Sequence, residues 1–129
     1  MERNPIQPQT VSTPASNYSQ ALVVECGRVL FVSGQVPVDG EGNLVGAGDF
    51  PAQASQVFEN IKAIVEEAGG SMANVIKITV FLTDIATYKD FAQVRSQYVQ
   101  EPYPAATLVA VQSLVDPQWM IEVEAIAAL

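Results

Sequence analysis

The stretch Val75-Ile76-Lys77-Ile78-Thr79-Val80-Phe81-Leu82-Thr83 has the alternating pattern of a half-buried β-strand. Two sets of side chains would point to opposite faces of a sheet: Ile76, Ile78, Val80 and Leu82 on one face, and Lys77, Thr79, Phe81 and Thr83 on the other. The first set is wholly apolar and has to be buried. We therefore expect this strand to lie in a sheet with one face covered by other elements.

A helix is predicted before this strand. Asp49 is a plausible N-cap, and Pro51 lies in the first turn, where proline is tolerated. From Ala54 to Ala68 apolar residues recur at helical spacing, and Gly69-Gly70 ends the pattern. One face of this helix should lie on the sheet.

A second predicted helix follows the strand and carries an arginine on its apolar side. Thr87, with an aspartate three residues later, resembles a capping box, and the helix continues to about Gln100. On a helical wheel Arg95 lies within the apolar arc, next to Phe91. A guanidinium in that place must snorkel to water, pair with a carboxylate such as Glu122, or face a cleft that binds an anion. The sequence leaves these alternatives open.

Four more segments are predicted to be strands, at residues 21–26, 29–33, 105–111 and 120–127. Gly27-Arg28 separates the first two and is a hairpin signal. Met1 to Ser16 is rich in Pro, Ser, Thr and Gln and is expected to be an irregular arm. The order β-β-α-β-α-β-β predicts one α+β domain over residues 1–129, with both helices on one face of an open sheet.

Composition excludes several classes of function. The 129 residues carry a net charge of −8, with six basic residues, so we expect no nucleic-acid partner. There is no histidine and only one cysteine, Cys26, which leaves no zinc site and no Ser/His/Asp triad. Cys26 is expected to be a small buried hydrophobe, and Trp119 a packing residue. No apolar run reaches membrane-spanning length and no signal peptide is recognised, so a cytoplasmic location without a membrane partner is expected.

Two polar groups near strand ends are candidates for chemistry. Glu122 and Glu124 share one face of the last predicted strand, opposite Ile121 and Val123. That face is either solvated, or one of its carboxylates looks into a cleft and orients water. Ser33-Gly34 ends the second strand and either forms a plain turn or offers a hydroxyl and an open backbone N–H to a ligand.

Five segments match, in order, the pattern of one known family. They are Tyr18–Ala21, Val32–Pro37, Asn60–Ala63, Val75–Asp84 and Ile121–Ala127. The pattern resembles that of the Rid family of reactive intermediate deaminases, also called YjgF-type proteins, from about Pro14 to Leu129.

The resemblance implies a chorismate-mutase-like α+β fold, a homotrimer, and a small molecule bound in the clefts between subunits. Typical members hydrolyse enamines and imines such as 2-aminoacrylate, without a cofactor or a metal. In them an arginine of a Pro-Ala-Arg-Ser-like motif holds the substrate carboxylate. A tyrosine, a serine and a C-terminal glutamate complete the pocket. Carried over to this chain, the catalytic residue is Glu122. The substrate-binding residues are Tyr18, Ser33, Gly34, Phe91, Arg95, Ala106 and Thr107.

The sequence departs from the family at that arginine. Its motif is Pro104-Ala105-Ala106-Thr107, so Ala106 stands at the arginine position, and no basic residue follows Arg95. The family usually has asparagine at the position of Arg95, which suggests that the cation has been relocated. Activity toward 2-aminoacrylate is therefore expected to be weak.

Two functions remain open at this point. One is a cofactor-free hydrolase of a small imine or enamine that carries a carboxylate. The other is a non-catalytic member that binds a metabolite or a partner protein, in which Ala106 marks lost chemistry. Nucleic-acid cleavage, sometimes ascribed to the family, conflicts with the net charge of −8.

Overall fold

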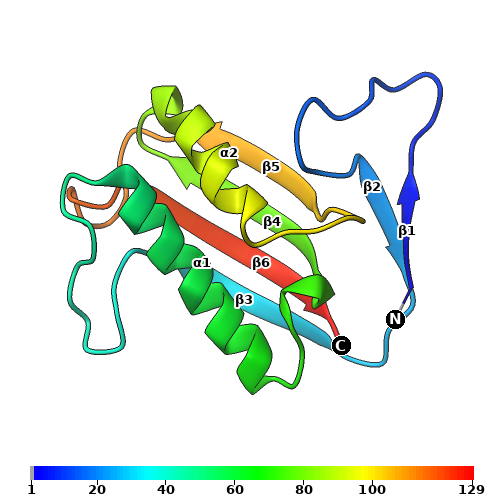
Figure 1. Cartoon of the computed structure of the whole chain (residues 1–129), viewed down its shortest axis with the longest axis horizontal. Helices are drawn as coiled ribbons and strands as arrows, with labels where there is room; N and C mark the ends of the chain where they lie inside the picture. The colour runs from blue at the N-terminus through cyan, green and yellow to red at the C-terminus, as the bar shows by residue number, and fades with distance from the viewer. Residues whose placement is uncertain (1) are drawn as a thin grey trace.

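Two helices cover one face of a four-stranded mixed sheet in the computed structural model, which describes residues 2–129 (Figure 1). The strand order is β3-β6-β4-β5, with β4 and β5 parallel and the other neighbours antiparallel. The elements are β3 (Val29–Gln35), α1 (Phe50–Glu67), η1 (Met72–Asn74), β4 (Val75–Leu82), η2 (Ile85–Thr87), α2 (Tyr88–Ser96), β5 (Ala105–Ala110) and β6 (Ile121–Ala128). The predicted α+β class, with both helices on one face, is confirmed.

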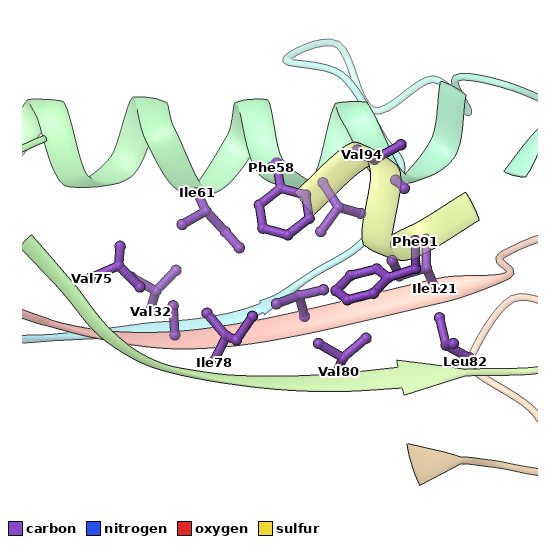
Figure 2. Packing of buried hydrophobic residues seen from close by; sticks show 14 of the residues in the cluster. Val32, Phe58, Ile61, Val75, Ile78, Val80, Leu82, Phe91, Val94 and Ile121 are labelled. Carbon is purple, nitrogen blue, oxygen red and sulfur yellow. The ribbon is translucent and has the colours of Figure 1, made fainter. Parts of the chain in front are cut away.

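The central strand β4 directs its apolar side chains toward the helices, as predicted. Ile78, Val80 and Leu82 are buried beneath α1 and α2 (Figure 2). The expectation for Ile76 is wrong, because the register against β6 shifts between Val75 and Lys77. Val75 turns inward and is fully buried, whereas Ile76 is half-buried.

The first helix has the predicted ends. The Asp49 side chain accepts a hydrogen bond from Ala52 N over 3.2 Å, and proline lies at the first turn. After the helix, Gly69 has a φ of +94°, a conformation that favours glycine. Phe58 and Ile61 on the buried face of α1 reach the sheet, as Figure 2 shows.

The second helix is shorter than predicted. It ends at Ser96 and not near Gln100. Thr87 precedes it without a side-chain cap bond, and its hydroxyl donates to the Asp84 carbonyl over 2.7 Å. The expected capping box is therefore wrong, and Asp84 instead caps the single turn η2.

The first 24 residues contain a separate two-stranded ribbon. β1 (Arg3–Ile6) pairs antiparallel with β2 (Ala21–Val24), and β2 does not pair with β3. The predicted hairpin through Gly27-Arg28 is therefore wrong, and the arm expected to be irregular contains a strand; its first residue, Met1, lies outside the described residues. Figure 1 places the ribbon beyond the end of the four-stranded sheet. Cys26 is consequently exposed rather than buried.

The hydrophobic core lies between the helices and the sheet. The Phe58 and Phe91 rings lie 5.9 Å apart between their centroids, and join the two helices there. Trp119, expected to be a packing residue, is half-buried in the loop before β6. No helix formed by residues 2–129 is both long enough and apolar enough to cross a membrane.

Candidate functional site

The Glu122 carboxylate lies directly over the backbone of Gly34. Glu122 is on β6, and Gly34 lies where the register between β3 and β6 shifts after Val32. A Cβ atom at position 34 would overlap Glu122 Oε2 and lie 2.9 Å from its Cδ, so only glycine leaves room for the carboxylate. Ser33 is the preceding residue. The structure thus places Glu122 against Gly34, with Ser33 adjacent to Gly34 in the chain.

Glu122 has no cation beside it to neutralise its charge. Among residues 2–129 one ion pair is formed, between Lys62 and Glu66, at 3.5 Å. Nor do any three His, Cys, Asp or Glu side chains in this part of the chain group closely enough to hold a metal ion. The half-buried Glu122 carboxylate can therefore accept a hydrogen bond, and then a proton, from water.

Arg95 is the one buried cationic side chain among residues 2–129. It is 3% exposed, and its Nη2 donates to Ser16 Oγ over 2.7 Å. The guanidinium carbon lies 5.2 Å from the centre of the Phe91 ring, while Nε has no hydrogen-bond partner. Arg95 thus neither snorkels to water nor pairs with Glu122. A buried guanidinium without a neighbouring anion is energetically unfavourable.

The N-terminal arm fixes Tyr18 between α2 and β5. Ser16 binds Arg95, and three residues later Ser19 N donates to the Pro104 carbonyl over 3.0 Å. The Ser19 hydroxyl also donates to the Tyr103 carbonyl over 2.6 Å. The predicted residues Tyr18 and Arg95 therefore belong to one junction, which lies at the start of β5.

The remaining predicted residues are divided between the two faces of the sheet. Phe91 is fully buried and reaches a ligand only through the guanidinium stacked on it. Ala106 packs partly against the core, on the helix side. Thr107 is exposed on the opposite face, where its hydroxyl accepts a hydrogen bond from Lys77 Nζ over 3.0 Å.

One chain does not close the predicted site. Ala106 is opposite Ile78 in β4, and Glu122 is opposite Phe81. At about 3.3 Å per residue and about 4.8 Å between strands, this register separates Ala106 and Glu122 by roughly 14 Å. Their side chains also point to opposite faces. The half-site of Ser33, Gly34 and Glu122 is thus distinct from the half-site of Tyr18, Arg95 and Ala106.

Tyr98 carries a further hydroxyl and follows Arg95 of the second half-site by three residues in the sequence. Its ring stacks on Phe58 at 5.0 Å between centroids. Burial, followed by the neighbouring Glu59, raises the pKa of Tyr98 to about 12. This hydroxyl stays protonated at neutral pH and does not serve as a base.

Sequence reasoning missed a cavity beside the second half-site. It has a volume of about 330 Å³ and is lined by Pro5, Ser19 and the loop from Glu101 to Tyr103. Ser19 belongs to the Tyr18–Ala21 motif, which was a usable signal. Pro5 gave none, because its position depends on the unexpected strand β1.

Comparison with known proteins identifies relatives over nearly the whole chain. The family model described as Endoribonuclease L-PSP matches residues 9–129. A RutC family protein of Pyrococcus abyssi is 41% identical, over 98% of this chain and 98% of its own length. A 2-iminobutanoate/2-iminopropanoate deaminase of Dermatophagoides farinae is 31% identical, over 97% of this chain and 92% of its own length.

Solved structures share the fold to different extents. A Rid family protein of unknown function from Yersinia pestis superposes with a TM-score of 0.90 at 33% identity, covering 100% of both chains. RidA from an Antarctic Psychrobacter superposes with a TM-score of 0.74 at 40% identity, covering 98% of this chain and 100% of its own. From its sequence, its fold and these relatives, the chain belongs to the Rid family, which the matching model describes as Endoribonuclease L-PSP.

Proposed function

We propose that this chain is a cofactor-free hydrolase of small imines or enamines that carry a carboxylate. The observation that carries the proposal is the Glu122 carboxylate, which lies over Gly34 and forms no ion pair within residues 2–129. The relationship to a 2-iminobutanoate/2-iminopropanoate deaminase supports the same class of reaction. The net charge of −8 disfavours the RNA cleavage named in the family description. A cytoplasmic location is part of the proposal.

In the proposed mechanism Glu122 acts on water. Its carboxylate takes a proton from the water molecule while the oxygen attacks the carbon of the C=N bond. The nitrogen is protonated, and the tetrahedral product releases ammonia and leaves a carbonyl group. Each imine thus consumes one water and yields one ammonia. The Ser33 hydroxyl and the Gly34 N–H orient the substrate, and an enamine enters the path once a proton has added to its terminal carbon.

Arg95 is the group that we propose for the substrate carboxylate. Ser16 Oγ now occupies one of its N–H groups, and Nε has no partner. A carboxylate in place of the hydroxyl would form charge-assisted bonds and neutralise the guanidinium. Because Ala106 stands at the family's arginine position, the cation would contact the carboxylate from a different place in the pocket, and activity toward 2-aminoacrylate should be weak.

A complete site requires two subunits, because the two half-sites of one chain lie apart on opposite faces of the sheet. We therefore propose a homotrimer with its ligand in the clefts between subunits. The face of the sheet that the helices leave uncovered supports this assembly. It presents Phe31, Phe81 and Val109, of which Phe31 is 74% and Val109 41% exposed. Burial of this apolar face between subunits would be favourable.

The alternative is a non-catalytic protein that binds a small anion. Two observations favour this alternative. The Arg95 guanidinium is bound by Ser16, and Arg95 does not line the 330 Å³ cavity. In that case Arg95 would bind a carboxylate and Glu122 would be dispensable.

Ammonia release separates the two. A pyridoxal-phosphate-dependent dehydratase generates 2-aminoacrylate or 2-iminobutanoate in the assay. The rate at which this intermediate releases ammonia in the presence of the chain is compared with its spontaneous rate. The unmodified chain should accelerate ammonia release, and Glu122→Gln, which keeps the shape of the side chain, should abolish the acceleration. No acceleration with either substrate, in a protein that still binds pyruvate, would establish the alternative.

A further inference from the structure

β3 forms one edge of the four-stranded sheet, and its outer side has no partner strand among residues 2–129. It pairs with β6 on its inner side. At this edge Val29 is 49% and Phe31 is 74% exposed. Residues 29–35 include no charged residue and no proline, the types that commonly protect an edge strand from pairing. β3 is therefore an open template for another strand.

β2 has a free edge of the same character. Within the described chain it pairs with β1 on one side and with nothing on the other. Its residues are all apolar, and Val23 is 53% exposed. Residues 25–28 connect the end of β2 to the start of β3, so these two free edges are neighbours in sequence but not in space.

The bonds of Ser19 keep β2 away from β3 of the same chain. Ser19 is tied to Pro104 and Tyr103, and it forms a parallel bridge with Ala105 at the start of β5. β5 and β3 are opposite edges of the sheet, three inter-strand spacings or about 14 Å apart. β2 begins only two residues after Ser19. It cannot lie along β3 while this anchor holds.

We propose that β2 of one copy of this chain adds to the β3 edge of a second copy. The pairing would be antiparallel, with the register that the Gly27-Arg28 turn would impose within one chain. Val24 would then face Phe31, and Val23 would face Val32. The exchange pairs backbone groups of both edges and covers Phe31 and Val23, while each arm stays anchored to its own β5. This inference does not depend on the proposed catalytic function.

A solved structure supports the detached position of the ribbon. If the 28 residues before Val29 did not superpose, the TM-score could not exceed 101/129, or about 0.78. The score of 0.90 against the Yersinia pestis protein is above this limit, so more than half of these 28 residues superpose in that crystal structure. The score of 0.74 against RidA is below it, although the sequence is more similar. Two arrangements of the segment before β3 thus fit these scores.

The exchange has a directional geometry. The donated edge, on β2, and the accepting edge, on β3, are different surfaces, so each copy donates to one neighbour and accepts from another or from the same one. Such contacts form a reciprocal pair, a closed ring, or an open filament where the rotation between copies does not close. A ring of three is compatible with the proposed trimer, in which each exchanged strand would link two neighbouring subunits.

Cysteine cross-linking between chains tests the exchange. In a Cys26→Ser background, one tagged chain carries Val24→Cys and a second, differently tagged chain carries Phe31→Cys. The two are co-expressed and oxidised. A covalent heterodimer that a reducing agent separates is the expected result. In the matched control, Asn4→Cys with Val23→Cys in a single chain should form a disulfide within that chain, because these residues face each other in the ribbon.

Two results would overturn the proposal. One is an intrachain disulfide, and no interchain product, when Val24→Cys and Phe31→Cys are placed in the same chain. The other is no disulfide at all at these positions while the control pair is oxidised. Hydrogen exchange on the unmodified chain gives a second, independent test. Amides of residues 29–35 that point outward should exchange slowly in the oligomer, and fast exchange there would equally exclude a partner strand.

Discussion

Arg95 Nη2 donates a hydrogen bond to Ser16 Oγ over 2.7 Å and so joins α2 to the N-terminal arm. Arg95 is 3% exposed, and its guanidinium lies over the Phe91 ring with Nε unpaired. A hydroxyl satisfies one N–H group but cannot neutralise a buried positive charge. The positive charge of Arg95 is therefore left without an ion-pair partner among residues 2–129.

We expect a small carboxylate such as pyruvate to bind at Arg95. Arg95→Gln should weaken binding by about 10- to 150-fold, because a charge-assisted contact contributes roughly 1.5–3 kcal/mol. Titration calorimetry or NMR gives the dissociation constants. Lys89→Gln on the exposed face of the same helix is the matched control and should bind like the unmodified protein. If a crystal soaked in pyruvate shows the anion elsewhere, Arg95 does not replace the family's arginine.

Gly34→Ala should reduce turnover while leaving the fold intact. The added Cβ overlaps Glu122 Oε2, so the carboxylate must move away from its place over residue 34. Loss of a positioned general base lowers the rate by about 100-fold or more. Gly40→Ala is the control, because its Cβ would meet no atom within 4 Å. Ammonia release gives the rates, and thermal unfolding reports on the fold. Equal rates for the two variants would remove Glu122 from the mechanism.

The parts of the fold that depend on local pattern could be predicted from the sequence. β4 and α1 were predictable because alternation, the Asp49 cap and Gly69 act within a few residues. The bulge that turned Val75 inward was not, because it depends on the pairing with β6. The hairpin at Gly27-Arg28 failed for a related reason. Gly27-Arg28 is a local turn signal. The hairpin does not form because Ser19 is hydrogen-bonded to Tyr103 and Pro104, which are distant in the sequence.

The candidate site was predictable in composition but not in arrangement. The helical wheel identified Arg95 as an unusual cation, and strand parity placed Glu122 on the uncovered face of the sheet. Neither pattern contains the distance between them. The separation of the two half-sites comes from the sheet register, which places Glu122 and Ala106 about three residues apart along β4 and on opposite faces. Contacts between subunits could not be predicted either, because residue spacing in one sequence does not report which surfaces of two chains meet.

Light scattering should report a mass of three chains of 13.8 kDa each. Phe81 lies on the uncovered face of the central strand, opposite Glu122 and Val109. Phe81→Glu would place a charge among apolar groups and carboxylates of that face, and should shift the mass toward one chain. Val115→Glu is the control, since Val115 is 91% exposed in a loop. A single-chain mass for the unmodified protein at micromolar concentration would contradict the trimer.

The last prediction concerns the exchange of one cation for another. If Arg95 has replaced the family's arginine, Arg95→Asn should reduce the rate on 2-aminoacrylate by about 10- to 150-fold, the range expected for one charge-assisted contact. Ala106→Arg restores the family's motif, and the double variant Arg95→Asn/Ala106→Arg should recover most of the lost rate. Because both positions would hold the same carboxylate, the two effects should not be additive. kcat/KM for the four proteins of this cycle provides the measurement. Additive effects would mean that Arg95 and position 106 act on different groups, and a silent Ala106→Arg would mean that the pocket has diverged beyond this one residue.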